Sequence, residues 1–424
     1  MYCRRCGRSD SSSEWKETIM IRAIVGAGGK TSLIKQYVKE YLAAGQKVFV
    51  TASTHMFIED DTLLTDDAEE IIRVLDEKHY VMAGIRQGEK IGPLSWETYE
   101  KVCQHADMVL IEADGSKHMP LKFPNDCEPV IYENVDEIVV VCGLHALNQK
   151  AGEAVQRLEL AKRYLSMTED TRITPFWIQE LVLRGYMEPL REKYPEKTIQ
   201  LKVNHRPSYY ERAVAALLET EAGLLHHKVG CVIMASGLGK RYGSNKLLEQ
   251  FRGKTLIQHV LDVTGDHLFE KRVVVTRSPE VAGICEEQGV DVILHKLPFR
   301  NDTIRLGIEA MEDMEGCMFC PCDQPLLRRE SLECMVYCHL YERISGCQNI
   351  MRLGYLGKEG APVLFPKEYF PELAALPEHC GGSVLLKNHA SNVYVMQADC
   401  EWELFDIDTK EDLHYLEKVI ESLT

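Results

Sequence analysis

The glycine-rich segment Met234–Lys246 has residue types and spacing suited to binding a nucleoside triphosphate. It follows an apolar run, and Gly237 and Gly239 would let the backbone approach phosphates closely. Arg241 can donate two parallel hydrogen bonds to phosphate oxygens, and Lys246 would place a charge beside the α-phosphate as pyrophosphate leaves. The pattern predicts a nucleotidyltransferase loop with Arg241 and Lys246 as catalytic cations. The predicted nucleotide-binding residues are Ala235, Ser236, Gly237, Leu238, Gly239 and Lys246.

Aspartates at two later points of the rear half could supply the metal ligands for such a reaction. Asp323 lies just past a short apolar run, at the end of a predicted strand, where ligands collect in α/β sheets. The segment Leu404–Thr409 predicts another strand end, which carries Asp406 and Asp408. We expect Mg²⁺ on Asp323, Asp406 and Asp408, with Asp323 also catalytic. Asp408 has a structural alternative, because Asp408 and Glu411 have the spacing of a helix capping box.

A second glycine loop, Gly26–Thr31, lies between a predicted strand and an amphipathic helix. Backbone N–H groups and a helix N-terminus converge on an anion at such a junction. The nucleotide-binding candidates are Gly26, Gly28, Gly29, Lys30 and Thr31, and ATP or GTP is the expected nucleotide. Lys30 would meet the terminal phosphates, and the candidate Mg²⁺ ligands are Thr31, Glu112 and Asp114. The alternative is that the glycines only let the helix pack on its strand, while Glu112 and Asp114 form a turn.

Two groups of closely spaced cysteines could suit zinc, but neither group requires a metal. Cys3 and Cys6 have no second pair nearby to complete four ligands, so a dispensable extension is favoured and their role stays open. Cys317, Cys320 and Cys322 run into a predicted core strand, where cysteine acts as a small apolar filler. We therefore expect no zinc site at either cluster.

Length and composition limit the possible classes of protein. The chain has 424 residues, of which 45% are hydrophobic and 27% charged, as is typical of a folded protein of two or three domains. Its 49 basic and 65 acidic residues give a net charge of −16, which disfavours nucleic acid and anionic membranes as partners. The 15 cysteines form no regular framework, no apolar stretch opens the chain, and no apolar run could cross a membrane. A cytoplasmic location is expected.

The elements that position these residues alternate between strands and helices, which predicts two α/β domains. The first domain should have a mostly parallel, P-loop NTPase-like sheet covered on both faces, and the second should be Rossmann-like. Predicted strands in the front half cover residues 19–25, 47–51, 80–83, 108–111, 138–142 and 199–203. In the rear half they cover residues 230–234, 273–276, 290–294, 318–319, 363–365, 393–396 and 404–407, before a last helix from Thr409. The expected division is a flexible tail (1–18), a first domain (19–224), a linker (225–229) and a second domain (230–424).

Several segments of the front half occur together: Val25–Ser32, Val50–Met56, Ile111–Lys117 followed by Pro120–Lys122, and Val139–Leu147. Across residues 19–224 they resemble the selenium-dependent hydroxylase accessory proteins of the YqeC type. The resemblance implies a domain similar to P-loop NTPases that serves the maturation of selenium-dependent molybdenum hydroxylases. A molybdenum hydroxylase apoenzyme is therefore an expected partner.

The rear half carries, in order, the 234–246 loop, Asn301–Gly307, Cys322–Pro325, Gly360–Pro362, Gly381–Gly382 and Asp406–Thr409. This order resembles the molybdenum cofactor cytidylyltransferases among the MobA-like NTP transferases. The resemblance implies transfer of CMP from CTP to molybdopterin or its molybdenum-loaded form, with Mg²⁺ as cofactor and pyrophosphate as product. Ser236 stands where the cytidylyl branch usually has Ala and the guanylyl branch Gly, which favours CTP.

Two other functions remain open on the sequence. One is a sugar or polyol phosphate nucleotidyltransferase, and the other is a non-catalytic chaperone for the finished cofactor that uses nucleotides only as switches. The presence of Arg241, Lys246 and Asp323 together favours an enzyme. Arg305, on a predicted helix, could bind a second phosphate or simply face solvent.

Overall fold

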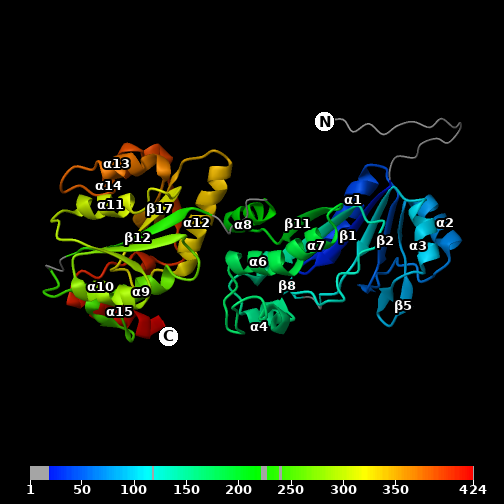
Figure 1. Ribbon diagram of the computed structural model, residues 1–424, viewed down its shortest axis with the longest axis horizontal. Helices are drawn as coiled ribbons and strands as arrows, with labels where there is room; N and C mark the ends of the chain where they lie inside the picture. Colours follow the sequence, from blue (N-terminus) through cyan, green and yellow to red (C-terminus); the bar gives the residue numbers. More distant parts are fainter. Residues whose placement is uncertain (1–18, 117–118, 221–226, 238–240, 424) are drawn as a thin grey trace. The chain divides into compact units, whose positions relative to one another are not determined.

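The computed structural model describes residues 19–116, 119–220, 227–237 and 241–423 (Figure 1). The expected tail over residues 1–18, with Cys3 and Cys6, lies outside this part of the chain. The chain divides into two compact units, Met1–His205 and Arg206–Thr424. Both are α/β units, as the alternation of elements predicts.

The N-terminal unit is built on a six-stranded parallel sheet in the order β11-β9-β1-β7-β2-β4. The strands are β1 (Met20–Gly26), β2 (Val48–Ala52), β4 (Tyr80–Met82), β7 (Met108–Glu112), β9 (Glu137–Gly143) and β11 (Thr198–Asn204). Strands β2 and β4, which follow β1 in the chain, lie on one side of it, and the later strands β9 and β11 lie on the other. The order of the strands therefore reverses at β1. The carboxyl edge next to such a reversal is where ligands bind in open α/β sheets.

Helices and small sheets surround this parallel sheet. Helix α1 (Lys30–Ala43) packs Leu33 and Ile34 into a core with Ile24, Val50 and Leu110. The other helices are α2 (Ala68–Lys78), α3 (Trp96–Cys103), α4 (Ala151–Ala154), α5 (Leu158–Ala161), α6 (Pro175–Val182) and α7 (Glu188–Lys193), with a π-helical turn at Leu183–Met187. Strands β3 (Met56–Phe57), β5 (Ile85–Gln87) and β6 (Lys90–Gly92) form a small sheet, and β8 (Leu121–Lys122) pairs with β10 (Val155–Gln156).

The C-terminal unit has a mixed seven-stranded sheet in the order β16-β15-β12-β17-β19-β18-β20. The strands are β12 (Val229–Ala235), β15 (Lys271–Thr276), β16 (Asp291–Leu294), β17 (Gly316–Pro321), β18 (Ile350–Tyr355), β19 (Lys358–Pro366) and β20 (Val393–Gln397). Strands β16, β15, β12 and β17 are parallel, so their carboxyl ends share one edge, whereas β19 runs antiparallel to β17 and β18. A two-stranded ribbon, β13 (Gln250–Phe251) with β14 (Lys254–Thr255), lies apart from this sheet.

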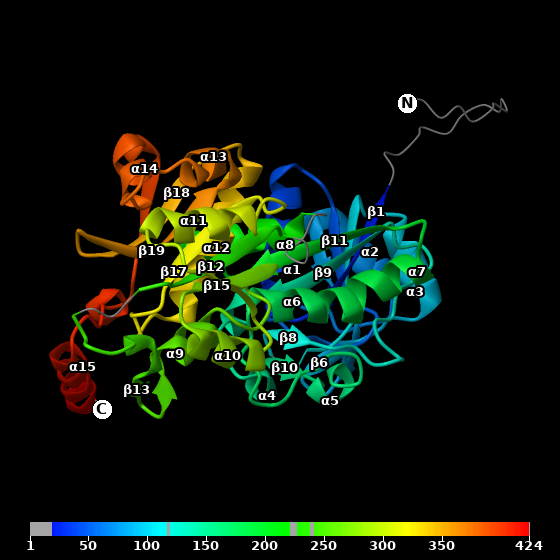
Figure 2. The same ribbon diagram turned by 60° about the vertical axis from the view of Figure 1, so that its left-hand side comes forward.

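Helices cover both faces of this second sheet. Figures 1 and 2 show α9 (Leu256–Val263), α10 (Pro279–Glu287) and α15 (Lys410–Leu423) on one side, and α11 (Arg300–Glu309), α13 (Phe370–Ala374) and α14 (Ser383–Asn388) on the other. Helix α12 (Arg329–Ile344) follows β17 and contacts β18. One core of the unit packs Val232, Val275, Ile304 and Phe365 between the sheet and the α11 side.

The observed division differs from the predicted linker at residues 225–229. Helix α8 (Tyr209–Glu219) begins with a capping box between Ser208 and Glu211 and packs against α12. The Tyr209 hydroxyl donates to Glu342 Oε1 at 3.3 Å, which ties α8 to the C-terminal unit. The boundary therefore falls before α8.

The predicted strand at residues 404–407 is wrong. A 3-10 turn, η6 (Glu401–Leu404), occupies its start, and residues 405–408 run on without pairing as a strand. Strand β18, which the sequence did not predict, lies between β19 and the edge strand β20. Within the described residues, none of the helices combines the length and the apolar character that a membrane crossing requires.

Candidate active site

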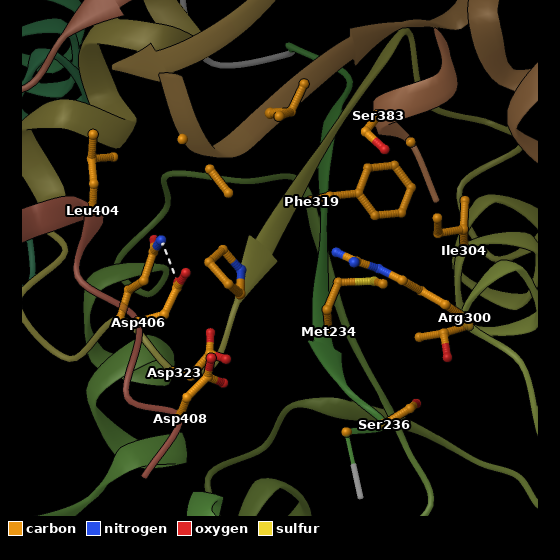
Figure 3. A pocket seen from close by; sticks show the side chains of 18 of the residues that line it. Met234, Ser236, Arg300, Ile304, Phe319, Asp323, Ser383, Leu404, Asp406 and Asp408 are labelled. Carbon is orange, nitrogen blue, oxygen red and sulfur yellow. Dashed lines mark hydrogen bonds between the residues drawn. The ribbon is translucent and has the colours of Figure 1, made fainter. Parts of the chain in front are cut away.

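A cavity of about 1000 Å³ lies at the carboxyl edge of the C-terminal sheet (Figure 3). Because β12 and β17 pair in parallel, Ser236 after β12 and Asp323 after β17 both reach it. Residues of β19, α11 and α14 supply the opposite walls. This volume is at the upper end of the roughly 300–1,000 Å³ typical of ligand pockets, so it leaves room for more than one small substrate.

Lys246 connects the glycine loop to both distant aspartate segments. Its Nζ lies 2.8 Å from Asp323 Oδ2 and 3.2 Å from Asp408 Oδ1, and it donates to the Ile407 carbonyl at 2.7 Å. The Ile407 N–H in turn donates to the Asp323 carbonyl at 2.8 Å. Burial lowers the pKa of Lys246, but Asp323 and Asp408 together raise it above its ordinary value. The three segments therefore meet at one charged lysine.

Asp406 lies in the same corner of the cavity, where its Oδ1 accepts a hydrogen bond from Gln324 Nε2 at 2.9 Å (Figure 3). Burial raises the pKa of Asp406, and the neighbouring Asp323 and Asp408 raise it further. No three His, Cys, Asp or Glu side chains among the described residues form a ready metal site. The donors still suit Mg²⁺, which commonly binds through one or two carboxylates, water and substrate phosphates.

Arg241 stands at the mouth of the cavity, with 73% of its side chain exposed and its Nη2 2.8 Å from Asp408 Oδ2. The structural alternative for Asp408, a capping box with Glu411, is not what the structure shows. Asp412 fills that place, because its Oδ2 accepts from the N–H groups of Asp408 and Thr409 at 3.0 and 2.7 Å. The Asp408 side chain is therefore left to pair with the two cations.

Hydrogen bonds from neighbouring strands fix the start of the glycine loop. Ser236 Oγ donates to the Val275 carbonyl at 2.9 Å and lies 2.8 Å from His295 Nε2, while Arg277 Nε donates to the Ser236 carbonyl at 2.8 Å. Sequence reasoning missed Arg277 and His295, although each follows a predicted strand at the ligand-binding edge. Of the other predicted loop residues, Ala235 is buried, Gly237 lines the cavity, and Leu238 and Gly239 lie outside the described residues.

The side of the cavity opposite the aspartates is apolar and cationic. In Figure 3 Arg300 extends into the cavity from the start of α11, beside Phe319 and Met234. Gly381 keeps room for this side chain, because a Cβ there would approach Arg300 Nε to 3.3 Å. Arg305, the candidate from the sequence, does not line the cavity and pairs instead with Glu309 at 3.0 Å. The signal for Arg300 was its place at a helix start after a strand.

In the N-terminal unit, the loop Gly26–Thr31 is packed tightly against its surroundings. A Cβ on Gly26 would lie 2.2 Å from the Val141 carbonyl oxygen, and one on Gly29 would lie 2.3 Å from Asn204 Nδ2. Asn204 also donates to the carbonyl of Gly29 at 3.1 Å. Close packing alone thus explains why these positions, and Gly28 between them, are glycine.

Lys30 does not point freely toward a phosphate site as predicted. Its buried Nζ donates to the Gly26 carbonyl at 2.8 Å and to the Asp114 carbonyl and Oδ1, both at 2.6 Å. Asp114 is fully buried, and its Oδ2 accepts from Gly26 N at 3.0 Å and the Tyr186 hydroxyl at 2.7 Å, with Lys122 Nζ at 3.1 Å. Despite burial, Lys30 and Lys122 hold the pKa of Asp114 below its ordinary value. Both oxygens of Asp114 are therefore bound by groups of the protein itself.

Glu112 has a different environment from Asp114. Its Oε1 lies 3.8 Å from Lys30 Nζ, and its buried Oε2 has no hydrogen-bond partner among the described residues. Burial raises the pKa of Glu112 to about 7, although Lys30 opposes this shift. Thr31 lies half-buried in the first turn of α1. Of the two predicted acidic ligands, only Glu112 keeps an oxygen available.

The cysteines of the C-terminal unit lie in its core. Cys317, Cys320 and Cys322 are buried on and just after β17, and Cys320 Sγ lies 3.6 Å from Cys231 Sγ on the neighbouring β12. Burial raises the pKa values of Cys317 and Cys322, whereas the contact with Cys231, together with burial, raises that of Cys320. These thiols therefore stay protonated. Apolar packing accounts for their position.

Comparisons with known proteins match the two units separately. Residues 22–159 match the family described as YqeC protein, and residues 231–393 match the MobA-like NTP transferase domain. The chain is 30% identical over 177 residues to the uncharacterized protein YqeC of Escherichia coli, covering 39% of this chain and 65% of that protein. It is 32% identical over 108 residues to a probable molybdenum cofactor guanylyltransferase of Bacillus licheniformis, covering 24% of this chain and 53% of that protein.

Each of these two alignments thus spans less than two thirds of the relative's length. Among solved structures, the Mycobacterium tuberculosis protein Rv0371c is 22% identical with a TM-score of 0.39, over 45% of this chain and 98% of that one.

Proposed function

Because the chain joins a region of the YqeC family to a MobA-like NTP transferase domain, we propose that its C-terminal unit is a molybdenum cofactor nucleotidyltransferase. The reaction transfers CMP from CTP to molybdopterin or its molybdenum-loaded form and releases pyrophosphate. The nucleotidyltransferase class follows from the domain match and from relatives named molybdenum cofactor guanylyltransferases. The choice of CTP and of this acceptor is our proposal.

One observation carries the proposal. Lys246 of the glycine loop and Asp323 of a separate strand end meet at 2.8 Å beside a cavity large enough for two substrates. A transferase needs a cation near the α-phosphate and a carboxylate that can hold Mg²⁺ at the same place. The pair meets both requirements at the carboxyl edge of the sheet.

The reaction makes modest chemical demands on the protein. The attacking phosphate monoester is largely dianionic near pH 7, with a second pKa of about 6, so no general base is required. The protein must bring two polyanions together and align them. Arg241 and Lys246 would bind phosphate oxygens and stabilise the charge that moves onto the leaving pyrophosphate. In doing so they would exchange part of their present pairing with Asp408 and Asp323 for phosphate contacts.

Asp323 and Asp406 are the residues that would hold Mg²⁺. Asp406 Oδ2 and Asp323 Oδ1 have no hydrogen bond or ion pair among the described residues, and the mutual repulsion of these carboxylates favours a cation between them. Bound Mg²⁺ would screen the repulsion between the two substrates and orient the triphosphate. Asp408, which already pairs with Lys246 and Arg241, would position those cations.

The nucleotide base needs a direct test. Ser236 favours CTP by its resemblance to the cytidylyl branch, whereas the matched relatives are named guanylyltransferases. The side chain of Ser236 already bonds to Val275 and His295, so any base contact at this position would come from the backbone.

We assign the N-terminal unit an accessory role in the maturation of selenium-dependent molybdenum hydroxylases. The match of residues 22–159 to the YqeC family supports this role. A molybdenum hydroxylase apoenzyme would be the partner that receives the finished cofactor.

The test is a substrate panel with the full chain. Protein is incubated with Mg²⁺, one of CTP, GTP or ATP, and one of molybdopterin, its molybdenum-loaded form, a sugar phosphate or a polyol phosphate. Pyrophosphate release is measured and the adduct is identified by mass. The proposal predicts a cytidylyl adduct of the pterin. A sugar or polyol adduct would show that the proposed acceptor is wrong, and a guanylyl adduct would show that the proposed nucleotide is wrong. If no pair of substrates released pyrophosphate, the result would favour a cofactor chaperone.

A further inference from the structure

Glu112 in the N-terminal unit has one buried oxygen, Oε2, without a hydrogen-bond partner among the described residues. It lies near the start of α1, and we propose that this region is a second nucleotide site. A Mg²⁺-bound nucleoside triphosphate would lie on the first turn of α1, with Glu112 as the carboxylate that faces its cation. This site belongs to a different unit from the transferase cavity and is independent of the proposed transfer reaction.

The anion half of the site is the start of α1. Gly29 occupies the N-cap position with φ 125°, and no side chain in the described part of the chain caps the helix. The first N–H groups of a helix have no intrahelical partners, and with the helix dipole they attract an anion. Strand β1 leads directly into this turn at the reversal point of the sheet. Because no described side chain caps these N–H groups, they are available to phosphate oxygens of a triphosphate.

The cation half lies on the two strands next along the sheet. Glu112 ends β7, only 8% of the residue is exposed, and its Oε2 has no hydrogen-bond partner among the described residues. Thr54 follows β2 just beyond the position paired with Glu112, and its buried Oγ1 likewise lacks a partner there. A buried carboxylate oxygen without a donor is costly, so it calls for a bound cation or donor. Oxygen ligands of this kind suit Mg²⁺.

Lys30 connects the two halves. It is the first residue of α1, and its Nζ lies 3.8 Å from Glu112 Oε1 while donating to the Asp114 Oδ1 at 2.6 Å. If a terminal phosphate takes one of these contacts, Asp114 still has Gly26 N, Tyr186 and Lys122 as donors. Lys30 can therefore turn to the phosphate without leaving Asp114 unpaired. Asp114 therefore positions Lys30, and of the two acidic residues predicted as Mg²⁺ ligands we assign only Glu112 that role.

The test counts nucleotides bound per full-length chain. Equilibrium dialysis is carried out with ATP or GTP and with CTP, each with and without Mg²⁺. ATP or GTP should bind at one site in the N-terminal unit, and CTP at one site in the C-terminal unit. Glu112→Gln should weaken the ATP or GTP site roughly 10- to 100-fold in the presence of Mg²⁺, because one charged ligand is lost. Glu77→Gln, which changes an exposed glutamate on α2, should leave both sites intact. Binding of Mn²⁺, followed by electron paramagnetic resonance with ATP present, should fall in parallel.

Two results separate this proposal from the transfer reaction. Asp323→Ala should not alter the Glu112-dependent site, and loss of that site through Asp323 would overturn the proposal. Nucleotide binding that is equal in Glu112→Gln and wild type would also overturn it, whatever the outcome for pyrophosphate release. If Glu112→Gln fails to fold, Thr31→Val changes only a half-buried hydroxyl in the same turn and should show the same loss of Mg²⁺ dependence.

Discussion

Lys246 Nζ lies 2.8 Å from Asp323 Oδ2, although 77 positions separate the two residues in the chain. The parallel pairing of β12 and β17 brings the segments that follow both strands to the same edge of the sheet, and Lys246 lies on the turn Lys246–Leu248 of the first segment. Asp408 approaches the same ammonium group at 3.2 Å from a third segment. One lysine therefore holds together the loop and the acidic residues on which the proposed reaction depends.

Lys246→Met should reduce turnover roughly 10²- to 10³-fold, which is the usual effect of removing one group that stabilises transition-state charge. The variant also leaves Asp323 and Asp408 facing each other without their shared cation. Initial rates of pyrophosphate release would measure the loss. Lys254→Met, which removes an exposed ion pair with Asp262, is the matched control. Equal rates for the two variants would exclude Lys246 from the chemistry.

Arg300→Ala should raise the KM of one of the two anionic substrates by about tenfold to a hundredfold, because a charged hydrogen-bond donor in the cavity is lost. Separate titrations of the nucleotide and the acceptor would show which substrate Arg300 contacts. Arg305→Ala is the control on the same helix, since Arg305 pairs with Glu309 away from the cavity. Unchanged KM values for both substrates in Arg300→Ala would show that Arg300 faces the cavity without binding either.

Asp114→Ala should destabilise the N-terminal unit by about 3–5 kcal/mol, because two buried lysines would lose their common carboxylate. Tyr186→Phe removes one hydrogen bond to the same charged carboxylate and leaves its other donors in place, so it should cost less, about 1.5–3 kcal/mol. Urea unfolding of both variants, followed by a signal from the N-terminal unit, gives the comparison. Similar losses for the two variants would contradict the central place of Asp114.

Two histidines, the buried His339 and the half-buried His227, should make the C-terminal unit less stable in acid. Burial lowers the pKa of His227 to about 4 and that of His339 to about 3, against about 6.5 in the unfolded chain. The unfolded chain therefore binds protons that the folded chain does not, so this stability is fully present above pH 6.5 and is lost as pH falls toward 4 and 3. At pH 5 the loss is roughly 2 kcal/mol for each histidine.

Urea unfolding of wild type and His339→Gln at pH 7.5 and pH 5 would test this linkage. The stability of wild type should fall more steeply than that of the variant, because glutamine does not titrate. A parallel fall of both proteins would mean that other groups cause the acid sensitivity.

The regular alternation of strands and helices made most of the fold accessible from sequence. Apolar runs such as Val139–Cys142 and Val273–Val275 identified central strands, and the two glycine loops marked where β1 and β12 end. The failures involve elements whose pattern is decided by tertiary contacts. Residues 404–407 have the alternation of a strand, but Ile407 bonds to the Asp323 carbonyl instead of to a neighbouring strand. Likewise, α8 belongs to the C-terminal unit because it packs against α12, which is far away in the sequence.

The candidate sites show the same limit. Residue type and position after a strand were sufficient to select Asp323, Asp406 and Lys246. They could not show that Asp114 is fully occupied while Glu112 is not, because the donors come from Tyr186 and Lys122 on other elements. Nor could they separate Arg300 from Arg305, since the difference is which side of α11 faces the cavity.

The most direct test of the account is the rate of pyrophosphate release from CTP by Asp323→Asn, with molybdopterin as acceptor. Asp323 is partly exposed, so the substitution should leave the unfolding transition close to that of wild type. The rate of Asp323→Asn should be at least about 100-fold below wild type, while Asp313→Asn, an exposed change away from the cavity, keeps the full rate. A normal rate for Asp323→Asn would contradict the proposed site.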